Sequence, residues 1–400
     1  MKPDFAIEII QKLRGLQYEA YLVGGCVRDM VMGLEPADYD IATSARPEDI
    51  MKVFPRTEAI GAQFGVVLVI HHGHPFEVAT FRSDDAYVDG RRPTGVVFTD
   101  AKTDVLRRDF TINGLLYDPV GKTVLDYVSG QKDIEAGIVR AIGDPSRRFA
   151  EDKLRILRAI RFGARLGYSI EPDTWKAVCV TAPQIHQVSM ERIQGEIVRI
   201  LTEGQPRTGF QMMHDSGLLK EVLPEVRWSE YLADCLGMLK RGVTADFAMA
   251  VLLNELPAPE AQRVMERLKC SRAEISHTTC LVSGRSQFRS LQHMSVSGMK
   301  RFFRIARFED HLELERICRT ALHADLTDYD LATRKFHSWT RDELSPVPLI
   351  TGEDLIAMGY APGPMFKEAL SSVEDEQLEN RLMDRKSASD FIKRKYGRNE

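Results

Sequence analysis

Short apolar runs of strand length mark the first third of the chain. Strands are predicted where β-branched and aromatic residues gather between turn residues, at 18–25, 39–43, 66–72, 75–82 and 123–128. The sequence HGHP separates the third run from the fourth and predicts a hairpin turn. Before these strands, an amphipathic helix is predicted with one apolar side formed by Phe5, Ile9, Ile10 and Leu13. The pattern predicts a head that mixes sheet and helix.

From about residue 148 onward the hydrophobic pattern keeps the period of a helix. The segment EDKLRILRAIRFGARLGY, at 151–168, predicts a helix that includes both Asp152 and Arg155. Breaks are predicted where proline and glycine interrupt the pattern, at 201–206, 256–262 and 345–354. The predicted fold class is therefore α+β, with an N-terminal mixed sheet followed by a long all-helical region.

Composition narrows the class of protein. A chain of 400 residues predicts two or three domains, and 44% hydrophobic with 28% charged residues is typical of a globular chain rather than a disordered one. No apolar run approaches the ~20 residues that cross a bilayer, and no secretory signal begins the chain. The six cysteines lack metal-site spacing, so we expect reduced thiols in a cytoplasmic protein with no membrane partner. The net charge of −4 means that nucleic acid would have to bind local basic surfaces.

Gly24 and Gly25 lie between a predicted strand and a predicted helix over 27–32. Glycines let the backbone approach a phosphate closely, and free N–H groups at the start of a helix attract anions. Arg28 lies on the first turn, where its guanidinium can bind a phosphate oxygen. The alternative is a simple turn without a ligand.

Asp38 and Asp40 are the candidate metal ligands and catalytic residues. Residues two apart on a strand share a face, so both carboxylates project together while Tyr39 turns toward the core. Like charges repel unless a cation lies between them, and oxygen ligands beside a triphosphate favour Mg²⁺. Such ions activate an attacking 3′-hydroxyl and stabilise the leaving pyrophosphate. The alternative for the two aspartates is a solvated edge strand. Glu77, on the next hairpin, is a candidate third ligand, and its alternative is an ordinary exposed glutamate on a strand.

Several motifs, taken in order, resemble those of the class II tRNA nucleotidyltransferases, a superfamily that also includes bacterial poly(A) polymerases. They are GGCVRD, Asp-Tyr-Asp, RRDFTING at 107–114 and EDKLR at 151–155. The resemblance covers about residues 18–200, with a second match over 346–395. It implies a polymerase-β-like catalytic head followed by helical neck, body and tail regions, with boundaries at 1–140, 141–205, 206–270 and 271–400.

The resemblance also implies roles for individual residues. The expected metal ligands are Asp38 and Asp40; the expected triphosphate-binding residues are Gly24, Gly25, Arg28, Arg107 and Arg108; the expected ribose-binding residues are Asp109, Thr111 and Asn113. Carboxylate and amide groups suit this last role because they bond a 2′-hydroxyl that a deoxynucleotide lacks. The alternative for RRDFTIN is a helix start capped by Asp109.

Asp152 and Arg155 are candidates for selecting the base. On a helix they share a face, and a carboxylate only accepts hydrogen bonds whereas a guanidinium only donates them. Cytosine and adenine both place an amino donor beside a ring acceptor, while uracil and guanine reverse that polarity. The pair would therefore accept CTP and ATP and reject UTP and GTP without a template. In the family this motif selects the base, and Arg158 is expected to face the same nucleotide; the alternative is an intrahelical ion pair.

Two further segments bear on the product and the partner. Residues 83–100 resemble the flexible loop that in the family helps switch the pocket from CTP to ATP, and that CC-adding enzymes typically lack. The C-terminal region resembles that of bacterial CCA-adding enzymes, and we expect the basic cluster Lys393, Arg394 and Lys395 to meet phosphates of the tRNA acceptor stem or elbow.

Two histidine motifs are not expected to be metal sites. HHGHP at 71–75 lies in a predicted hairpin turn with no further ligand nearby in the sequence. His214-Asp215 has none of the spaced partners that a metal-dependent phosphohydrolase needs.

The sequence thus predicts an enzyme that adds CCA to tRNA 3′ ends from CTP and ATP with Mg²⁺. Addition of A alone, addition of CC alone, poly(A) synthesis and a catalytically silent RNA-binding protein remain alternatives. The stretch 34–38 lacks the basic pair usual before the aspartates of poly(A) polymerases. The intact Asp38, Asp40, Asp152 and Arg155 argue against a silent protein. Oligomeric state is not predicted.

Overall fold

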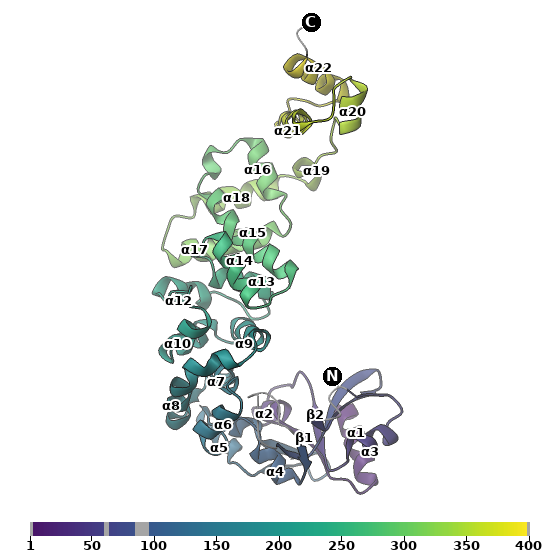
Figure 1. Ribbon diagram of the computed structural model, residues 1–400, viewed down its shortest axis with the longest axis vertical. Coiled ribbons are helices and arrows are strands. Elements are labelled where there is room, and N and C mark those ends of the chain that lie inside the picture. The colour runs from purple at the N-terminus through teal and green to yellow at the C-terminus, as the bar shows by residue number, and fades with distance from the viewer. Residues whose placement is uncertain (1–2, 60–63, 85–95, 398–400) are drawn as a thin grey trace. The chain divides into compact units, whose positions relative to one another are not determined.

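The computed structural model describes residues 3–59, 64–84 and 96–397. The chain divides into two compact units (Figure 1): Met1–Ala248 with Val264–Cys270, and Met249–Arg263 with Ser271–Glu400. The division passes through two helices, α13 (Ala245–Leu252) and α14 (Ala258–Arg267). The four regions drawn from the sequence remain a prediction, since this division is coarser.

The first unit begins with a seven-stranded mixed sheet, which confirms the predicted head. The order across the sheet is β3-β4-β5-β2-β1-β8-β9, and only the β2–β5 pair is parallel. The strands are β1 (Ala20–Val23), β2 (Asp40–Thr43), β3 (Thr57–Glu58), β4 (Val66–His71), β5 (His74–Thr80), β8 (Leu115–Asp118) and β9 (Thr123–Asp126). Two smaller sheets pair β6 (Arg82–Asp84) with β7 (Val96–Phe98), and β10 (Ile138–Val139) with β11 (Ser169–Ile170).

Strand register explains why a turn and an acidic residue become neighbours. Val23, the last residue of β1, pairs with Asp40, the first residue of β2, and also with Leu116 of β8. Val23 and Leu116 belong to an apolar cluster that packs against Val105. The glycine turn that follows β1 therefore leaves the sheet beside Asp40.

Helices cover the sheet because each has an apolar side. The head helices are α1 (Pro3–Gly15), α2 (Gly25–Val31), α3 (Pro47–Val53), α4 (Ala101–Leu106) and α5 (Gly130–Ala136). The predicted amphipathic helix is α1, which buries Ile9, Ile10 and Leu13 and leaves Phe5 half-buried. In both views α1 and α3 lie beside the sheet (Figure 1).

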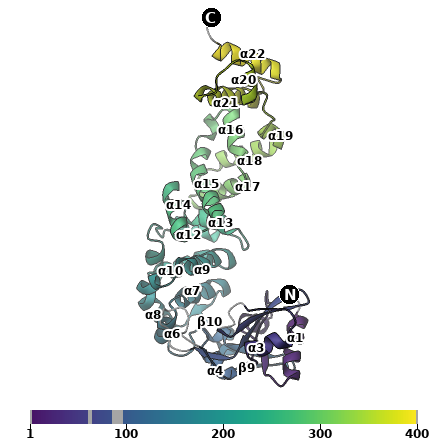
Figure 2. The same cartoon turned by 45° about the vertical axis from the view of Figure 1, so that its right-hand side comes forward.

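The rest of the first unit is helical. Its helices are α6 (Pro145–Glu151), α7 (Arg155–Leu166), α8 (Pro172–Thr181), α9 (Met190–Glu203), α10 (Pro206–Asp215), α11 (Leu218–Val222) and α12 (Glu230–Gly237). Helices α7, α9 and α10 pack against one another, as Figure 2 shows. None of the helices among the described residues combines the length and hydropathy that a bilayer crossing requires.

The predicted helix across Asp152 and Arg155 is wrong, because the chain breaks between α6 and α7. Asp152 has an extended backbone (φ −143°, ψ 105°), and its Oδ1 accepts a hydrogen bond from the backbone N–H of Leu154 at 3.0 Å. An aspartate side chain that binds a nearby backbone N–H competes with the helix for it. The two residues therefore belong to different segments, and Arg155 begins α7.

The second unit consists of helices with two separate apolar cores. Its helices are α15 (Arg272–Phe288), α16 (Val296–Phe303), α17 (Phe308–Ala321), α18 (Thr327–Ser338), α19 (Arg341–Leu344), α20 (Gly352–Ala357), α21 (Pro364–Leu378) and α22 (Arg385–Tyr396). One core is aromatic and centres on Phe302, Phe303 and Phe308. The other joins α20, α21 and α22 through Leu355, Val373 and Ile392.

Candidate active site

A cavity of about 860 Å³ lies within the first unit, and both predicted site regions line it. Asp38 and Asp40 contribute from the head, and Asp152 and Arg155 contribute from the break between α6 and α7. Ten arginines and six acidic residues line the cavity. This excess of positive charge suits an anion such as a triphosphate.

The glycine turn begins α2 and lies under two guanidinium groups. Gly24 has φ +75°, a conformation that glycine adopts without strain. A Cβ placed on Gly24 would lie 3.3 Å from Arg108 Nη1, and one on Gly25 would lie 3.7 Å from Arg28 Nη2. Arg28 is buried, and it donates to Asp29 at 2.6 and 2.9 Å and to Asn113 at 2.7 Å. Its guanidinium is therefore already oriented before any ligand binds.

The predicted metal ligands lie at the end of the sheet. Tyr39 is buried while Asp38 is exposed and Asp40 half-buried, which is the predicted burial pattern. The predicted strand begins too early, however, because β2 starts at Asp40 and the other two residues precede it. Burial, together with the negative charges of Asp38 and Glu77, raises the pKa of Asp40 to about 6. Arg108 lowers this pKa only in part, and a cation bound beside Asp40 would lower it further.

Glu77 lies close to Asp40 but does not line the cavity. The parallel register pairs Ile41 with Val78, which makes Glu77 the neighbour of Asp40 across β2 and β5. Within the described part of the chain, only Glu8, His71 and His72 bring three ligand atoms within 4.8 Å of one another. Asp38, Asp40 and Glu77 are more widely spaced, so the third-ligand role of Glu77 stays a prediction.

Arg107 and Arg108 follow α4 and are fixed by one buried carboxylate. Asp104 Oδ1 accepts from Arg107 at 2.7 and 2.9 Å, and its Oδ2 accepts from Arg108 at 3.0 and 3.3 Å. Burial alone would raise the pKa of Asp104, but the two guanidinium groups lower it. Both arginines line the cavity, and Arg108 also lies near Gly24. The positive charge of Arg108 lowers the pKa of Asp40.

Asp109 and Asn113 also line the cavity, as the ribose-binding prediction requires. Asp109 Oδ2 accepts from Arg158 at 2.6 and 2.9 Å, and its Oδ1 accepts from the backbone of Phe110 at 2.8 Å. Burial alone would raise the pKa of Asp109, but Arg158 outweighs it and lowers the pKa to about 2. Asp109 is therefore ionised throughout the physiological range.

Thr111 does not reach the cavity. Its hydroxyl donates to Asp133 at 2.6 Å, and its side chain is buried. It forms part of a short 3-10 turn (Thr111–Asn113) whose N-cap is Phe110, so Asp109 does not cap a helix start. The structure thus brings two of the three predicted ribose ligands together and leaves Thr111 in a supporting position.

Asp152 and Arg155 line the same cavity but do not pair with each other. Asp152 accepts from Arg192 at 2.7 and 3.3 Å. Arg155 donates to Glu151 at 2.9 Å and to two backbone carbonyl groups at 2.9 and 3.3 Å. The predicted alternative, an ion pair between the two, is therefore absent, and each side chain is held separately.

Sequence reasoning missed the residues that hold the site residues in place. Arg192 and Glu151 are two of them, and Glu196 is a third: it lies 2.9 Å from Arg161 and 3.8 Å from Arg158. The ring of Phe162 has the guanidinium groups of Arg28, Arg158 and Arg161 within 5.4 Å of its centre. The contact of Glu151 with Arg155 joins residues four apart and could have been predicted from the sequence, but those of Arg192 and Glu196 join residues far apart along the chain.

Lys393, Arg394, Lys395 and His214 are not among the residues that line the cavity. Lys393, Arg394 and Lys395 are exposed on α22 in the second unit, where Lys395 donates to Ser372 at 3.0 Å. Most of the predicted loop at 83–100 lies outside the described residues. His214 stacks on Trp228 with ring centres 6.2 Å apart.

Comparisons with known proteins match this architecture. Three family models match in order: "Poly A polymerase head domain" at residues 20–140, "Probable RNA and SrmB- binding site of polymerase A" at 167–229, and a model of tRNA nucleotidyltransferase domain 2 at 244–389. The chain is 33% identical over 383 residues to the CCA-adding enzyme of Streptococcus pneumoniae strain CGSP14, covering 94% of each chain.

Solved structures of CCA-adding enzymes have a similar fold. The CCA-adding enzyme of Bacillus stearothermophilus in complex with CTP matches with a TM-score of 0.80 and 27% identity, over 99% of this chain and 98% of that one. The Thermotoga maritima CCA-adding enzyme complexed with tRNA shares the fold at a TM-score of 0.67 and 18% identity, over 98% and 95%. From the long match to the Streptococcus enzyme we conclude that this chain belongs to the CCA-adding enzyme family and is a nucleotidyltransferase.

Proposed function

We propose that this chain adds CCA to the 3′ end of tRNA from CTP and ATP, with Mg²⁺ and without a nucleic-acid template. The observation that carries the proposal is that one cavity is lined by both Asp38 with Asp40 and Asp152 with Arg155. A nucleotide bound there presents its phosphates to the first pair and its base to the second. The relative with 27% identity was solved with CTP bound, which supports the same class of substrate here.

Asp38 and Asp40 are the residues that would hold Mg²⁺. Their oxygens are the hard ligands that this ion prefers, and burial together with the negative charges of Asp38 and Glu77 raises the pKa of Asp40 even though Arg108 lowers it in part. Bound there, Mg²⁺ lowers the pKa of an attacking 3′-hydroxyl and neutralises charge on the triphosphate.

The arginines around the glycine turn orient the triphosphate. Arg28 and Arg108 lie over Gly24 and Gly25, and buried carboxylates fix both guanidinium groups. Fixed donors lose little entropy when a phosphate binds, so they align the reacting phosphorus with the attacking oxygen. Asp109 and Asn113 line the cavity and are the residues that we assign to the ribose hydroxyl groups.

Asp152 and Arg155 read the base edge. Because each is held by another partner, a carboxylate acceptor and a guanidinium donor keep fixed directions in the cavity. Cytosine and adenine complement this order of acceptor and donor, whereas uracil and guanine would leave buried groups unpaired. The protein thus takes the place of a template.

The RNA partner is tRNA, bound at its acceptor stem and elbow. The basic residues of α22 give a phosphate-binding surface whose affinity falls as salt rises. We place the protein in the cytoplasm because bacterial tRNA maturation occurs there.

The test offers the purified chain three tRNAs, ending at the discriminator base, at C, and at CC, each with one labelled triphosphate at a time. The proposal predicts CTP addition to the first two substrates and ATP addition to the third, with no extension beyond A. Addition of A alone, addition of CC alone and poly(A) synthesis each give a different ladder, and any of these would refute CCA synthesis.

A further inference from the structure

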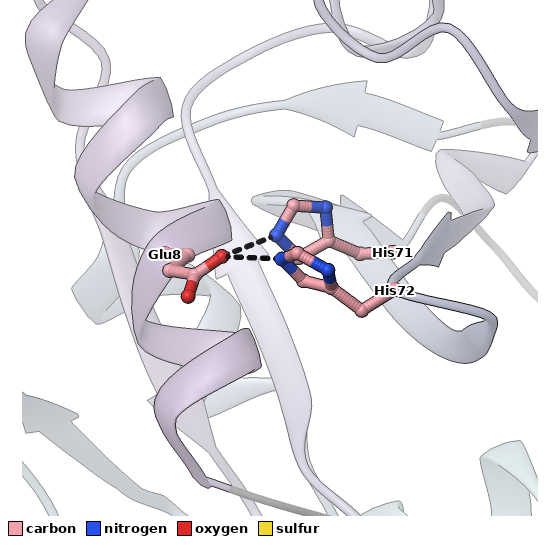
Figure 3. A group of neighbouring side chains, drawn as sticks. All are labelled: Glu8, His71 and His72. Atoms are coloured by element: carbon pink, nitrogen blue, oxygen red, sulfur yellow. Dashed lines mark hydrogen bonds and ion pairs between the residues drawn. The ribbon is translucent and has the colours of Figure 1, made fainter.

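A second cluster of ligating side chains lies in the head, apart from the residues assigned to nucleotide transfer. Glu8 Oε2 lies 2.8 Å from His71 Nε2 and 2.9 Å from His72 Nε2. Figure 3 shows both imidazole rings pointing their Nε2 atoms at the same carboxylate oxygen. Glu8 comes from α1 and the histidines from the end of β4, so residues 63 and 64 positions apart converge. The sequence argument against HHGHP failed at this point, because the further ligand comes from another element.

The hairpin holds the two histidines in place. His72 and Gly73 form its two-residue turn with φ values of 49° and 78°, and His71 pairs with His74 across the strands. Positive φ at both turn residues matches the twist of a two-residue hairpin. Phe5, on the same helix as Glu8, stacks on the His72 ring with centres 4.5 Å apart. Helix and hairpin therefore present the three ligands in one fixed arrangement.

We propose that Glu8, His71 and His72 form a binding site for Zn²⁺ or a similar divalent transition-metal ion. Two imidazole nitrogens and one carboxylate oxygen, with a water in the fourth position, are a ligand set that Zn²⁺ accepts in tetrahedral geometry at about 2.0–2.2 Å. The three ligand atoms all lie within 4.8 Å of one another. Ligand atoms around a tetrahedral Zn²⁺ ion are about 3.4 Å apart, so the 2.8 and 2.9 Å contacts of Glu8 lengthen by about half an ångström when the ion binds. Mg²⁺ is not expected here because it prefers oxygen ligands in an octahedral arrangement.

The surroundings favour loading of the site. The Glu8, His71 and His72 side chains are 46%, 26% and 53% exposed, so an ion reaches them directly from solvent. Glu8 supplies a carboxylate oxygen that faces both imidazole nitrogens, and a carboxylate is an anionic ligand that attracts a cation. A hydrogen-bonded trio without metal is the competing account, and it predicts no ion binding.

The ion would tie the N-terminal helix to the β4–β5 hairpin. Binding to the folded head but not to the unfolded chain stabilises the fold by mass action. The same hairpin bears Glu77 on β5, the neighbour of Asp40. A clamp at its turn therefore supports the sheet on which the proposed catalytic carboxylates lie, without entering the reaction.

The experiment titrates the full-length chain with Zn²⁺ by calorimetry in excess Mg²⁺, which occupies the proposed catalytic carboxylates. The variants are Glu8→Gln, His71→Asn and His72→Asn; asparagine suits the left-handed backbone at 72. His186→Asn is the matched control, because His186 Nε2 also lies on the surface 2.7 Å from one carboxylate, that of Glu221, but without a second histidine. Circular dichroism and melting curves in EDTA check that each variant folds.

We expect one Zn²⁺ per wild-type chain and an affinity reduced at least ~10-fold in each of the three variants, with the His186→Asn control unchanged. Zn²⁺ should raise the melting temperature of the wild-type chain and of the control. The rise should be much smaller in the three variants. Co²⁺ should give the visible absorption of a four-coordinate site in the wild-type chain and lose it in Glu8→Gln. No Zn²⁺ binding by the wild type, or equal affinities in the wild type and in all three folded variants, would overturn the proposal.

Discussion

The two ends of the cavity shift the pKa of an aspartate in opposite directions. At the sheet end, Asp40 lies beside Asp38 and Glu77, and its pKa is raised to about 6. At the helix end, Asp109 is bound by Arg158 and its pKa is lowered to about 2. One end is an acidic site that needs a cation, and the other is a set of fixed donors and acceptors. Under the proposed function, this contrast assigns the chemistry to the first end and recognition of the nucleotide to the second.

The largest expected effect comes from removing an acidic residue at the sheet end. Asp38→Ala should lower the rate of nucleotide addition at least ~10³-fold, because metal stabilisation of the transition state contributes several kcal/mol. Binding of tRNA should stay within a few-fold of wild type, since other residues contact the RNA. Single-turnover addition and a gel-shift titration measure the two quantities; retained turnover would refute the metal assignment.

At the helix end, the loss should appear in selectivity. Arg155→Ala should lower kcat/KM for CTP and ATP by ~10²-fold and raise the relative use of UTP and GTP, because the fixed donor to the base is lost. Arg147→Ala is the matched control: Arg147 pairs with the same Glu151 at 3.7 Å but is 83% exposed. Incorporation of each labelled triphosphate measures the effect, and unchanged selectivity in Arg155→Ala would remove Arg155 from base reading.

The acidic end should also respond to pH. Asp40 is ionised above its raised pKa and protonated below it, and only the ionised form binds Mg²⁺. Apparent Mg²⁺ affinity should therefore be near its plateau at pH 8 and fall about fivefold from pH 6 to pH 5, as a proton competes with the ion. Titrations of activity against Mg²⁺ at several pH values test this; an affinity independent of pH would contradict it.

Arg192 should give a smaller effect at the other end. It acts as a positioning residue, because its bidentate contact orients Asp152. Arg192→Ala should reduce discrimination between CTP and UTP about tenfold or less, with most of the change in KM. Arg192→Lys keeps the charge but loses the planar fork, so it should restore discrimination only in part. Identical discrimination in wild type and Arg192→Ala would leave Arg192 without this role.

Local sequence patterns predicted the parts of the site that depend on residues close together in the sequence. The sequence pattern predicted that Tyr39, which directly precedes β2, is buried and that Asp40 is accessible, and the two glycines predicted the turn before α2. Strand β8 was not predicted because it has only four residues, Leu115–Asp118, and comes shortly after a 3-10 turn. The helix break at Asp152 was missed because a side chain bonding to a backbone N–H overrode a strong helical period.

Partners from distant segments could not be predicted. Arg158 meets Asp109 across 49 residues, and Arg192 meets Asp152 across 40. Such ion pairs depend on how helices pack, which no local pattern encodes. The convergence of Glu8 with two histidines has the same origin.

The most direct test of the central claim measures the affinities of CTP and UTP for wild type, Asp38→Ala and Arg155→Ala, each with Mg²⁺ and with EDTA. In the proposed function, the sheet end binds the metal and the phosphates of one nucleotide, and the helix end reads the base of the same nucleotide. The account predicts that losing Asp38 or Mg²⁺ weakens both nucleotides while keeping the preference for CTP, and that losing Arg155 removes the preference while keeping the dependence on Mg²⁺. A preference for CTP that disappears with the metal and survives Arg155→Ala would contradict it.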